Sequence, residues 1–462
     1  MGTTEMARAL FGTSMAFHII FSTLGVGLPF MIVIAEILFH WKKDRDYAVL
    51  AKRWTRGFGI LLGVAIPSGT IVGVMLALLW PGFMEIVGQV IALPFQVEIW
   101  AFFLEALFMA IYVYAADRLS PVMRIVSVVL VAVGASASAV LITDAHAWMN
   151  TPRGFQLVNG QVTDIHPWAA VFNPSFFITS MHVLSTAYLT GAFAVTSIAA
   201  YKLLRGKLEE REAAYHRKAL MLSLIIGGAM ALLSSANGHS TAQMLHHHQP
   251  EKLAAAEGLF ETTAYAPLSI GGWTVESEQR VRGGIEIPWA LSFLAGNRFD
   301  TVVKGLNEFP RDTWPPLYVH TLFNLMVGIG VFLMALAFGA IFWRAWLKRP
   351  YPRWLLALGT ITGPLSIVGI ETGWIFSCTG RQPWTIYHIQ RTAEAAIHAQ
   401  SLAGLFVLFV SLYAFLLVVT IFVMRFYFHR HPVAPELQHP LEAPASLHKK
   451  RIGGGRLGGS PA

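Results

Sequence analysis

Imidazole and thioether side chains lie inside stretches of this 462-residue sequence that are otherwise apolar. His18 lies within Ala-Phe-His-Ile-Ile-Phe, His182 about seven residues into a later apolar run, and Met326 a similar distance into another. These groups are the usual axial donors to haem iron, and a His/Met pair raises its reduction potential. For each histidine we weigh a ligand role evenly against a structural one, whereas Met326 taken alone is interpreted first as packing.

Two carboxylates, Glu98 and Glu105, share the apolar segment Phe-Gln-Val-Glu-Ile-Trp-Ala-Phe-Phe-Leu-Glu-Ala. A separation of seven residues is almost two helical turns, so both side chains face the same way. Two buried acids on one face repel each other unless they hold protons, a metal or cationic partners. The pair therefore predicts either hydrogen bonds between helices or a proton relay beside a redox centre, and we favour the relay.

A third group of polar residues closes the apolar run that carries Glu371, in the segment Gly-Arg-Gln-Pro-Trp. Arg381 in this segment is suited to hold haem propionates through two parallel hydrogen bonds, or it anchors the helix at a membrane interface; the residues leave both interpretations open. The tract His246, His247 and His248 offers metal-ligand chemistry, but an isolated tract of this kind is more often a solvated loop.

The composition indicates the elements that position these residues. Hydrophobic residues make up 55% of the chain, charged residues only 13%, and the mean hydropathy is +0.54. Runs of about 20 apolar residues can cross the membrane, and they must be helical because lipid offers the backbone no hydrogen bonds. We predict an all-α membrane protein of about nine transmembrane helices, near residues 10–39, 57–80, 91–114, 122–143, 175–201, 218–236, 315–346, 354–377 and 400–428. The first run is too long for a signal-peptide core and is expected to be retained.

Lysine and arginine are distributed unevenly between the connections. The odd-numbered connections carry eighteen of these residues and the short even-numbered ones carry three. Because cytoplasmic loops are enriched in Lys and Arg, we predict an external N-terminus and a cytoplasmic C-terminus. The chain then divides into helices one to six (1–236), a large external loop (237–314), helices seven to nine (315–428) and a disordered cytoplasmic tail (429–462). The net charge of +8 lies mainly in these loops, which argues against nucleic-acid binding.

Several blocks, taken in order, resemble subunit I of the cytochrome bd quinol oxidases over nearly the whole chain. The most specific is Gly373-Trp374 followed by Gly-Arg-Gln-Pro-Trp at residues 380–384. Supporting pieces are Ala-Phe-Phe-Leu-Glu105, Asp117-Arg118-Leu119, Trp148-Met149 and Lys252-Leu-Ala-Ala-Ala-Glu257.

The resemblance implies a role for each candidate residue. His182 and Met326 would ligate a low-spin haem b, and His18 would ligate a haem of the oxygen-reducing pair. Glu98 and Glu105 would carry protons beside that pair. The remaining roles would fall to Lys252 and Glu257 in the quinol site of the external loop, to Trp374 on the electron path, and to Arg381 near the propionates.

The resemblance also implies an activity and its setting. The chain would be the catalytic subunit of an electrogenic quinol:dioxygen oxidoreductase in the bacterial inner membrane. Quinol would be oxidised at the outer face, and dioxygen would be reduced to water with protons drawn from the cytoplasm. The expected cofactors are low-spin haem b, haem b at the oxygen site, and haem d or a further haem b. The expected partners are subunit II, quinol, dioxygen, membrane lipid and a small accessory subunit.

The sequence departs from the family pattern at two positions. The only cysteine, Cys378, replaces a glutamate that ligates haem in the family, so we hypothesise a thiolate ligand there or a site supported by Glu371. Asn324 lies where some relatives carry arginine, which should alter the potential of the Met326 haem. The short external loop resembles the short-loop, often cyanide-insensitive, branch of the family.

Two other classes of function remain as alternatives to the oxidase. One is a diverged haem protein of the same fold that transfers electrons but no longer reduces oxygen; Lys252 and Glu257 favour the oxidase over it. The other is a transporter that relays protons through buried His and Glu without haem. Transporters often show paired halves with broken helices, which this sequence lacks, so this alternative is the weaker one.

Overall fold

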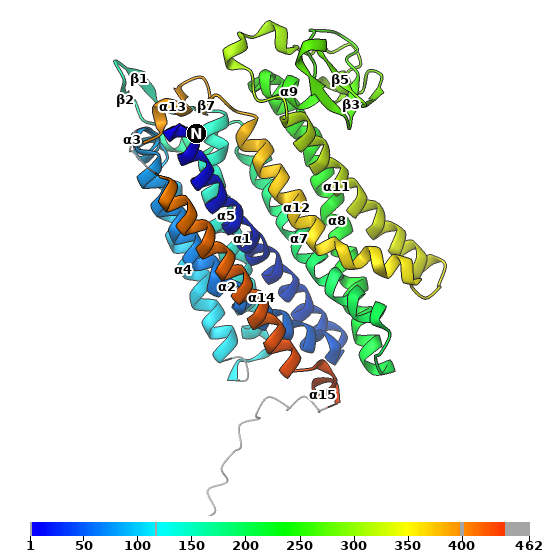
Figure 1. Cartoon of the computed structure of the whole chain (residues 1–462). Helices are drawn as coiled ribbons and strands as arrows, with labels where there is room; N and C mark the ends of the chain where they lie inside the picture. The colour runs from blue at the N-terminus through cyan, green and yellow to red at the C-terminus, as the bar shows by residue number, and fades with distance from the viewer. Residues whose placement is uncertain (1, 116–117, 398–401, 439–462) are drawn as a thin grey trace, which may run out of the picture.

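The structure is a computed structural model, and it describes residues 2–115, 118–397 and 402–438 (Figure 1). Nine helices within these ranges are long and apolar enough to cross a membrane, which confirms the predicted fold class. They are α1 (Thr3–Lys42), α2 (Arg45–Leu79), α4 (Ala92–Tyr114), α5 (Pro121–Asn150), α7 (Phe176–Arg205), α8 (Glu210–His248), α11 (Val319–Ile341, continued by a π-helical turn at Phe342–Trp346), α12 (Arg353–Thr379) and α14 (Ala403–Arg430).

Shorter elements gather at one end of the long helices, which we call the loop end (Figure 1). The short helices there are α3 (Pro81–Val90), α6 (Pro167–Val171), α9 (Pro250–Glu257), α10 (Ala290–Gly296) and α13 (Thr392–Ala395). The strands form four antiparallel pairs, β1 (Gln156–Val158) with β2 (Gln161–Thr163), β3 (Leu268–Ile270) with β6 (Ile285–Ile287), β4 (Trp273–Val275) with β5 (Arg280–Arg282), and β7 (Trp384–Ile386) with β8 (Gln390–Arg391).

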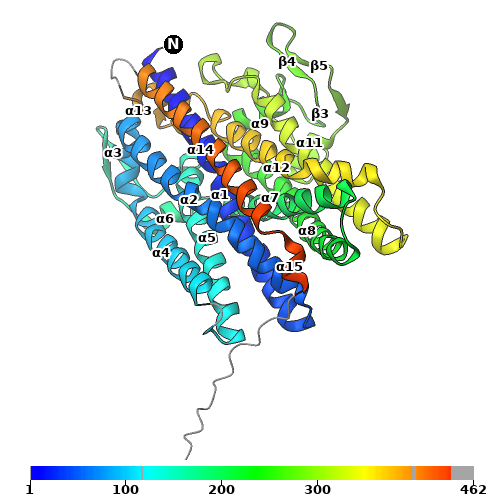
Figure 2. The same ribbon diagram turned by 60° about the horizontal axis from the view of Figure 1, so that its bottom comes forward.

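The long helices form two groups that lie side by side. Helices α7, α8, α11 and α12 make one group, and α1, α2, α4, α5 and α14 make the other, as Figures 1 and 2 show. Helix α1 packs against α7 and joins the two groups. One apolar core cluster contains buried residues of both groups, including Met31 of α1 and Phe193 of α7.

Two glycines allow α1 and α7 to approach backbone to backbone. A Cβ atom added to Gly27 would lie 2.9 Å from the Cα atom of Gly191, and one added to Gly191 would lie 2.8 Å from the Cα atom of Gly27. Small residues at helix crossings are how membrane helices come into close contact. The two halves of the molecule therefore meet at a fixed point on each helix.

Many apolar side chains of the long helices face outward. Of α14, only Tyr413 and Thr420 are buried, and its exposed residues include Phe415 and Phe422. Exposed apolar surface of this extent is typical of a face that contacts lipid or another membrane subunit.

The helices extend beyond several predicted boundaries. Helix α5 continues to Asn150 instead of ending at residue 143, and α8 continues to His248, so residues 237–248 are helical and the three histidines form its last turn. Hydropathy identifies only the apolar part of a helix, whereas the helical backbone hydrogen bonds continue into the polar residues beyond it. The prediction of a disordered tail at 429–462 is wrong for residues 429 and 430, which end α14, and for Val433–Gln438, which form α15. Asp117, residue 400 and residues 439–462 lie outside the described residues.

Ion pairs gather at the end opposite the loops, which we call the far end. Both Lys218 and Arg211 of α8 contact the buried carboxylate of Asp46 on α2, with Lys218 Nζ 2.6 Å from Asp46 Oδ2. Arg124 of α5 donates to the buried Glu36 of α1 at 2.6 Å. The α15 residue Glu436 pairs with Arg53 of α2 at 2.7 Å and holds α15 against the bundle.

Candidate functional site

His182 and Met326 lie near the loop-end starts of α7 and α11, two helices that both pack against α12. The Nδ1 atom of His182 is buried without a hydrogen-bond partner in the described ranges. A Cβ atom on Gly373 of α12 would lie 2.9 Å from the Met326 sulfur, so the glycine leaves room around that sulfur. A buried imidazole nitrogen without a hydrogen-bond partner, and a thioether sulfur with space beside it, are both suited to ligate haem iron.

His18 lies in the first half of α1. Its Nδ1 atom is 3.0 Å from the hydroxyl of Ser68 on α2, which fixes one ring nitrogen and leaves Nε2 for another partner. Gly69 lies directly beside the ring, where a Cβ atom would be 2.9 Å from Cε1. His18 and His182 each lie nine residues before the glycine of the α1–α7 crossing, Gly27 and Gly191 respectively. Because α1 and α7 run the same way (Figure 1), the two histidines lie at similar depth.

Glu98 and Glu105 both face α5, as their spacing predicts. Ser138 of α5 donates to Glu98 Oε1 at 2.5 Å, and Gly134, one turn away, lies against the backbone of Glu105. The Glu105 side chain is buried, with 5% of its surface exposed. The same packing that brings α5 against Glu98 thus also removes Glu105 from contact with solvent.

Polar residues from three elements meet at the loop end of α12. His146 of α5 lies 2.8 Å from the Ser377 hydroxyl, and its ring is 5.3 Å from that of Trp374 in an edge-on arrangement. Lys252 of α9 donates to the Ser377 carbonyl at 2.9 Å. The sequence analysis missed His146 because it ended the fourth span at residue 143; the search for ionisable residues in helices would have found it with the correct boundary.

Arg381 follows α12 and is buried, with 5% of its surface exposed. Its Nε atom donates to the Trp384 carbonyl at 3.4 Å, but Nη1 has no hydrogen-bond partner and no carboxylate lies within ion-pair distance among residues 2–115, 118–397 and 402–438. A buried guanidinium without a counter-ion is costly, so the position is suited to a bound anion such as a haem propionate.

Helix α9 buries both Lys252 and Glu257, which have 4% of their surface exposed. Burial, with nearby Arg381 adding to it, lowers the pKa of Lys252 to about 7. Burial raises the pKa of Glu257 to about 8, and its Oε2 atom has no partner in the part of the chain that the structure describes. Burial thus favours the uncharged form of both groups, and the unpartnered oxygen of Glu257 is available to bond a ligand.

One apolar cluster connects α9 with α11, which carries Met326, and with α12. It contains Ala254 to Ala256 of α9, Phe376 of α12 and Met326 of α11. Lys252 Nζ also lies 5.4 Å from the centre of the Phe376 ring. The predicted quinol residues and the predicted haem ligand Met326 thus border the same group of side chains.

The two positions at which the sequence departs from the family pattern, Cys378 and Asn324, lie in different surroundings. Cys378 is exposed on α12, whereas Glu371 is half-buried and its Oε1 atom has no partner within the described ranges. Asn324 accepts a hydrogen bond from the Gly271 amide at 2.7 Å and so ties the loop to α11. The described residues contain no cluster of three or more His, Cys, Asp or Glu suited to a metal ion, and the tract at 246–248 does not form one.

The fold defines a class of protein, a multi-pass membrane protein. Its half-buried His18, His182 and Met326, together with the buried Arg381, have the chemistry suited to a large anionic cofactor. The donor set, the space left by Gly69 and Gly373, and the unpaired atoms of His182 and Arg381 fit haem.

The comparisons identify the family. Residues 6–432 match the model of cytochrome bd terminal oxidase subunit I. The chain is 60% identical to a Bacillus subtilis protein named "Putative cytochrome bd menaquinol oxidase subunit I", over 95% of this chain and 99% of that protein. It is 30% identical to the cytochrome bd ubiquinol oxidase subunit 1 of the same organism, over 86% of each. The solved bd oxidase of Geobacillus thermodenitrificans is 43% identical, with a TM-score of 0.88, over 93% of this chain and 99% of that one.

The chain therefore belongs to the cytochrome bd terminal oxidase subunit I family, and the predicted resemblance is confirmed. It is a respiratory oxidoreductase subunit with the role of a terminal quinol oxidase.

Proposed function

We propose that this chain is the haem-carrying catalytic subunit of a complex that oxidises quinol at the outer membrane face and reduces dioxygen to water. The observation that carries the proposal is the contact of α9 with the end of α12. There Lys252 bonds the Ser377 carbonyl, and Ser377 bonds His146 beside Trp374. A substrate held by α9 would lie next to the aromatic residue on the proposed electron path.

We assign the low-spin haem b to His182 and Met326, and the haem b or haem d of the oxygen site to His18. Arg381 would bond propionates. Bound haem supplies one-electron and dioxygen chemistry. Ser68 would orient the His18 ring, and Gly69 and Gly373 would keep side chains away from the ligands.

The other residues of the chain handle substrate and protons. Glu257, protonated in the free site at neutral pH, would bond a quinol oxygen, and Lys252 would orient the ring. Glu98 and Glu105 would carry protons from the cytoplasmic side towards the oxygen site. Because those protons are drawn inward while quinol protons leave outside, turnover would generate a membrane potential.

We place the far end in the cytoplasm, since the Lys- and Arg-rich connections lie there, with the N-terminus outside in the inner membrane of a bacterium. The exposed apolar faces, such as that of α14, would contact lipid, subunit II and a small accessory subunit. Menaquinol is the substrate we favour, because the relative that is 60% identical is named a menaquinol oxidase subunit.

At position 378 this chain has cysteine where the family has a haem-ligating glutamate. We favour support of that haem by Glu371, whose Oε1 atom has no partner among the described residues, over ligation by Cys378, which is exposed. An electron paramagnetic resonance spectrum changed by Cys378→Ser but not by Glu371→Gln would reverse this assignment.

The proposal as a whole is tested on the purified membrane complex by haem extraction, a reduced-minus-oxidised spectrum and menaquinol-driven oxygen consumption. We expect three haems for each copy of this chain and quinol-dependent oxygen uptake. A single haem without oxygen uptake would contradict the proposal and favour an electron-transfer protein.

A further inference from the structure

A second buried carboxylate of α9 lies apart from the residues assigned above. Glu251 has 6% of its surface exposed, and it precedes Lys252 in the chain. Both of its oxygens are bonded: Oε2 accepts from the Tyr387 hydroxyl, and Oε1 lies 3.0 Å from His388 Nε2. Glu251 therefore differs from Glu257, which lies six residues later on the same helix with an unpartnered oxygen in the described part of the chain.

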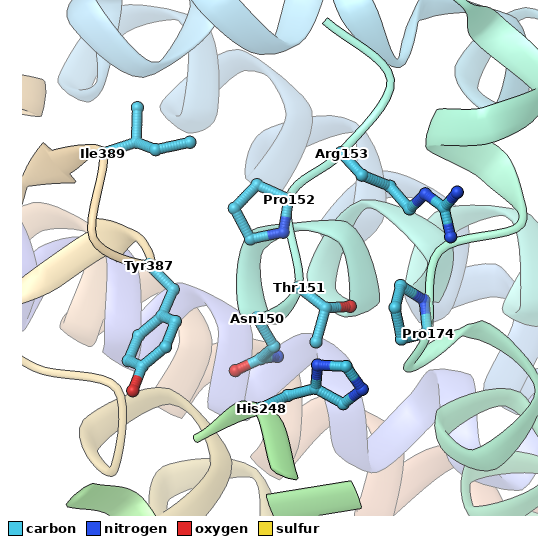
Figure 3. Close-up of a pocket in the computed structure, with 8 residues that line it drawn as sticks. All are labelled: Asn150, Thr151, Pro152, Arg153, Pro174, His248, Tyr387 and Ile389. Carbon is cyan, nitrogen blue, oxygen red and sulfur yellow. The ribbon is translucent and has the colours of Figure 1, made fainter. Parts of the chain in front are cut away.

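The partners of Glu251 lead to the surface. The His388 side chain is 54% exposed, and its ring stacks on that of Tyr387 at 4.0 Å. Tyr387 also lines a pocket of about 320 Å³ (Figure 3). Exposed residues Arg153, Pro174 and His248 line the same pocket, so it opens at the loop end. A proton on Glu251 thus has a short hydrogen-bonded route to water.

The hairpin that supplies these partners is the continuation of α12. Residues 380 and 381 border Lys252, since a Cβ atom on Gly380 would lie 3.0 Å from the Lys252 side chain. Six to seven residues later the same segment reaches Glu251. His388 occupies the turn with a φ of +57°, a conformation that costs a non-glycine residue energy. The turn that presents the imidazole to Glu251 is therefore held by its contacts.

We propose that Glu251, with His388 and Tyr387, forms the exit by which protons released from quinol at Lys252 and Glu257 reach the external solvent. The inference rests on the proposed function. Oxidation of one quinol to quinone gives two electrons, which leave to the haem of the complex, and two protons. Each of the two protons in turn bonds to a Glu251 oxygen, passes to His388 Nε2, and leaves from the exposed ring to water, which restores the carboxylate before the next transfer.

The charged groups around Glu251 suit this exchange. Lys252 adjoins it on α9, His388 and Tyr387 face it from the β7–β8 hairpin, and Arg153 and His248 line the pocket beside Tyr387. Burial and the carboxylate raise the pKa of Tyr387, so the phenol keeps its proton and donates to Glu251. His388 is the member of the group that joins the buried carboxylate to solvent, because its Nε2 atom lies 3.0 Å from Glu251 Oε1 and its side chain is 54% exposed.

The test uses the purified complex with haem bound. Glu251→Gln keeps the shape of the side chain but cannot take up a proton. We expect its kcat for quinol oxidation to fall about tenfold or more, the low end of what a positioned proton acceptor contributes, with KM within twofold and the haem spectrum unchanged. His388→Asn should show a smaller fall in kcat. Glu261→Gln, an exposed acid of the same loop, should have wild-type kcat.

Chemical rescue separates proton transfer from a structural role. Imidazole added to the buffer should restore kcat of His388→Asn, because the pocket beside Tyr387 gives it access; a packing defect would not respond. Unchanged kcat in Glu251→Gln and His388→Asn, or reduced kcat that imidazole does not raise in His388→Asn, overturns the inference while the wild-type complex still oxidises quinol. A wild-type complex that does not oxidise quinol overturns the proposed function as well. If Glu251→Gln does not assemble, the His388→Asn result decides.

Discussion

The two ends of the helix bundle treat buried charge in opposite ways. At the far end each buried acid has a cation: Asp46 has Lys218 and Arg211, and Glu36 has Arg124. At the loop end Lys252, Glu257 and Arg381 are buried with no ion-pair partner in the ranges that the structure describes. Because an unpaired buried ionisable group is costly, the paired far-end charges are explained by folding. At the loop end, the Arg381 charge and the unpaired Lys252 and Glu257, whose charged forms burial disfavours, call for a ligand.

If the loop end serves a ligand, the largest loss of activity should come from His182→Ala at that end. Loss of an axial ligand should remove the low-spin haem bands and lower quinol oxidation by more than about 100-fold, beyond the 10–100-fold cost of an outer-shell partner. Visible spectra and oxygen consumption of the purified complex measure both. His166→Ala, an exposed loop-end histidine, is the matched control, and intact haem bands in His182→Ala would show that His182 is not a ligand.

Arg381→Met should have the next largest effect. Removing one preorganised charged donor typically costs about 100-fold in rate, and we expect that order of loss in quinol oxidation. Thermal stability of haem-free protein should stay level or rise, since an unpaired buried charge has been replaced by an apolar group. Arg298→Met, at an exposed ion pair of the same loop, should retain wild-type activity; equal losses in the two variants would contradict the assignment.

Asp46→Asn should show the reverse behaviour at the far end. The side chain is 1% exposed and contacts Arg211 and Lys218, so its loss should lower the free energy of unfolding by about 2–3 kcal/mol. Activity of the folded complex should stay within twofold of wild type. Denaturant titration in detergent, followed by oxygen-consumption assays, separates the two. A large fall in activity of Asp46→Asn at unchanged stability would contradict the view that the far-end charges serve folding and the loop-end groups serve function.

The smallest effect concerns pH and Glu257. The folded carboxyl has a pKa near 8 against 4.5 for the ordinary group, so unfolding between these values releases a proton. Its contribution to stability is therefore full below about pH 4.5 and is lost as pH rises towards 8. Melting temperatures from pH 5 to 8 should fall less steeply in Glu257→Gln than in wild type, and parallel curves would show that Glu257 is ionised in the fold.

The long apolar helices could be predicted from the sequence because hydropathy and backbone hydrogen bonding leave one solution in lipid. Their ends could not, since polar helical turns such as those before Asn150 and His248 lack that signal. This error concealed His146. The shared face of Glu98 and Glu105 followed from helical periodicity, which is local.

Contacts between distant segments were out of reach for the same reason. The bonds from Glu251 to Tyr387 and His388 span 136 and 137 residues, and nothing near Glu251 in the chain indicates them. The roles of His18, His182 and Met326 stay predictions that spectra must decide. That Cys378 is exposed could not be predicted from the sequence, because the family glutamate at that position is a haem ligand.

The crossing of Gly27 and Gly191 has a consequence for how electrons would move between the halves. His18 and His182 each lie about 14 Å along their helices from that crossing, at 1.5 Å per residue. With bare backbone touching there, neither helix can slide or roll without a clash. The pair of glycines would thus fix the distance between the two proposed redox centres, and a single added methyl group would change it.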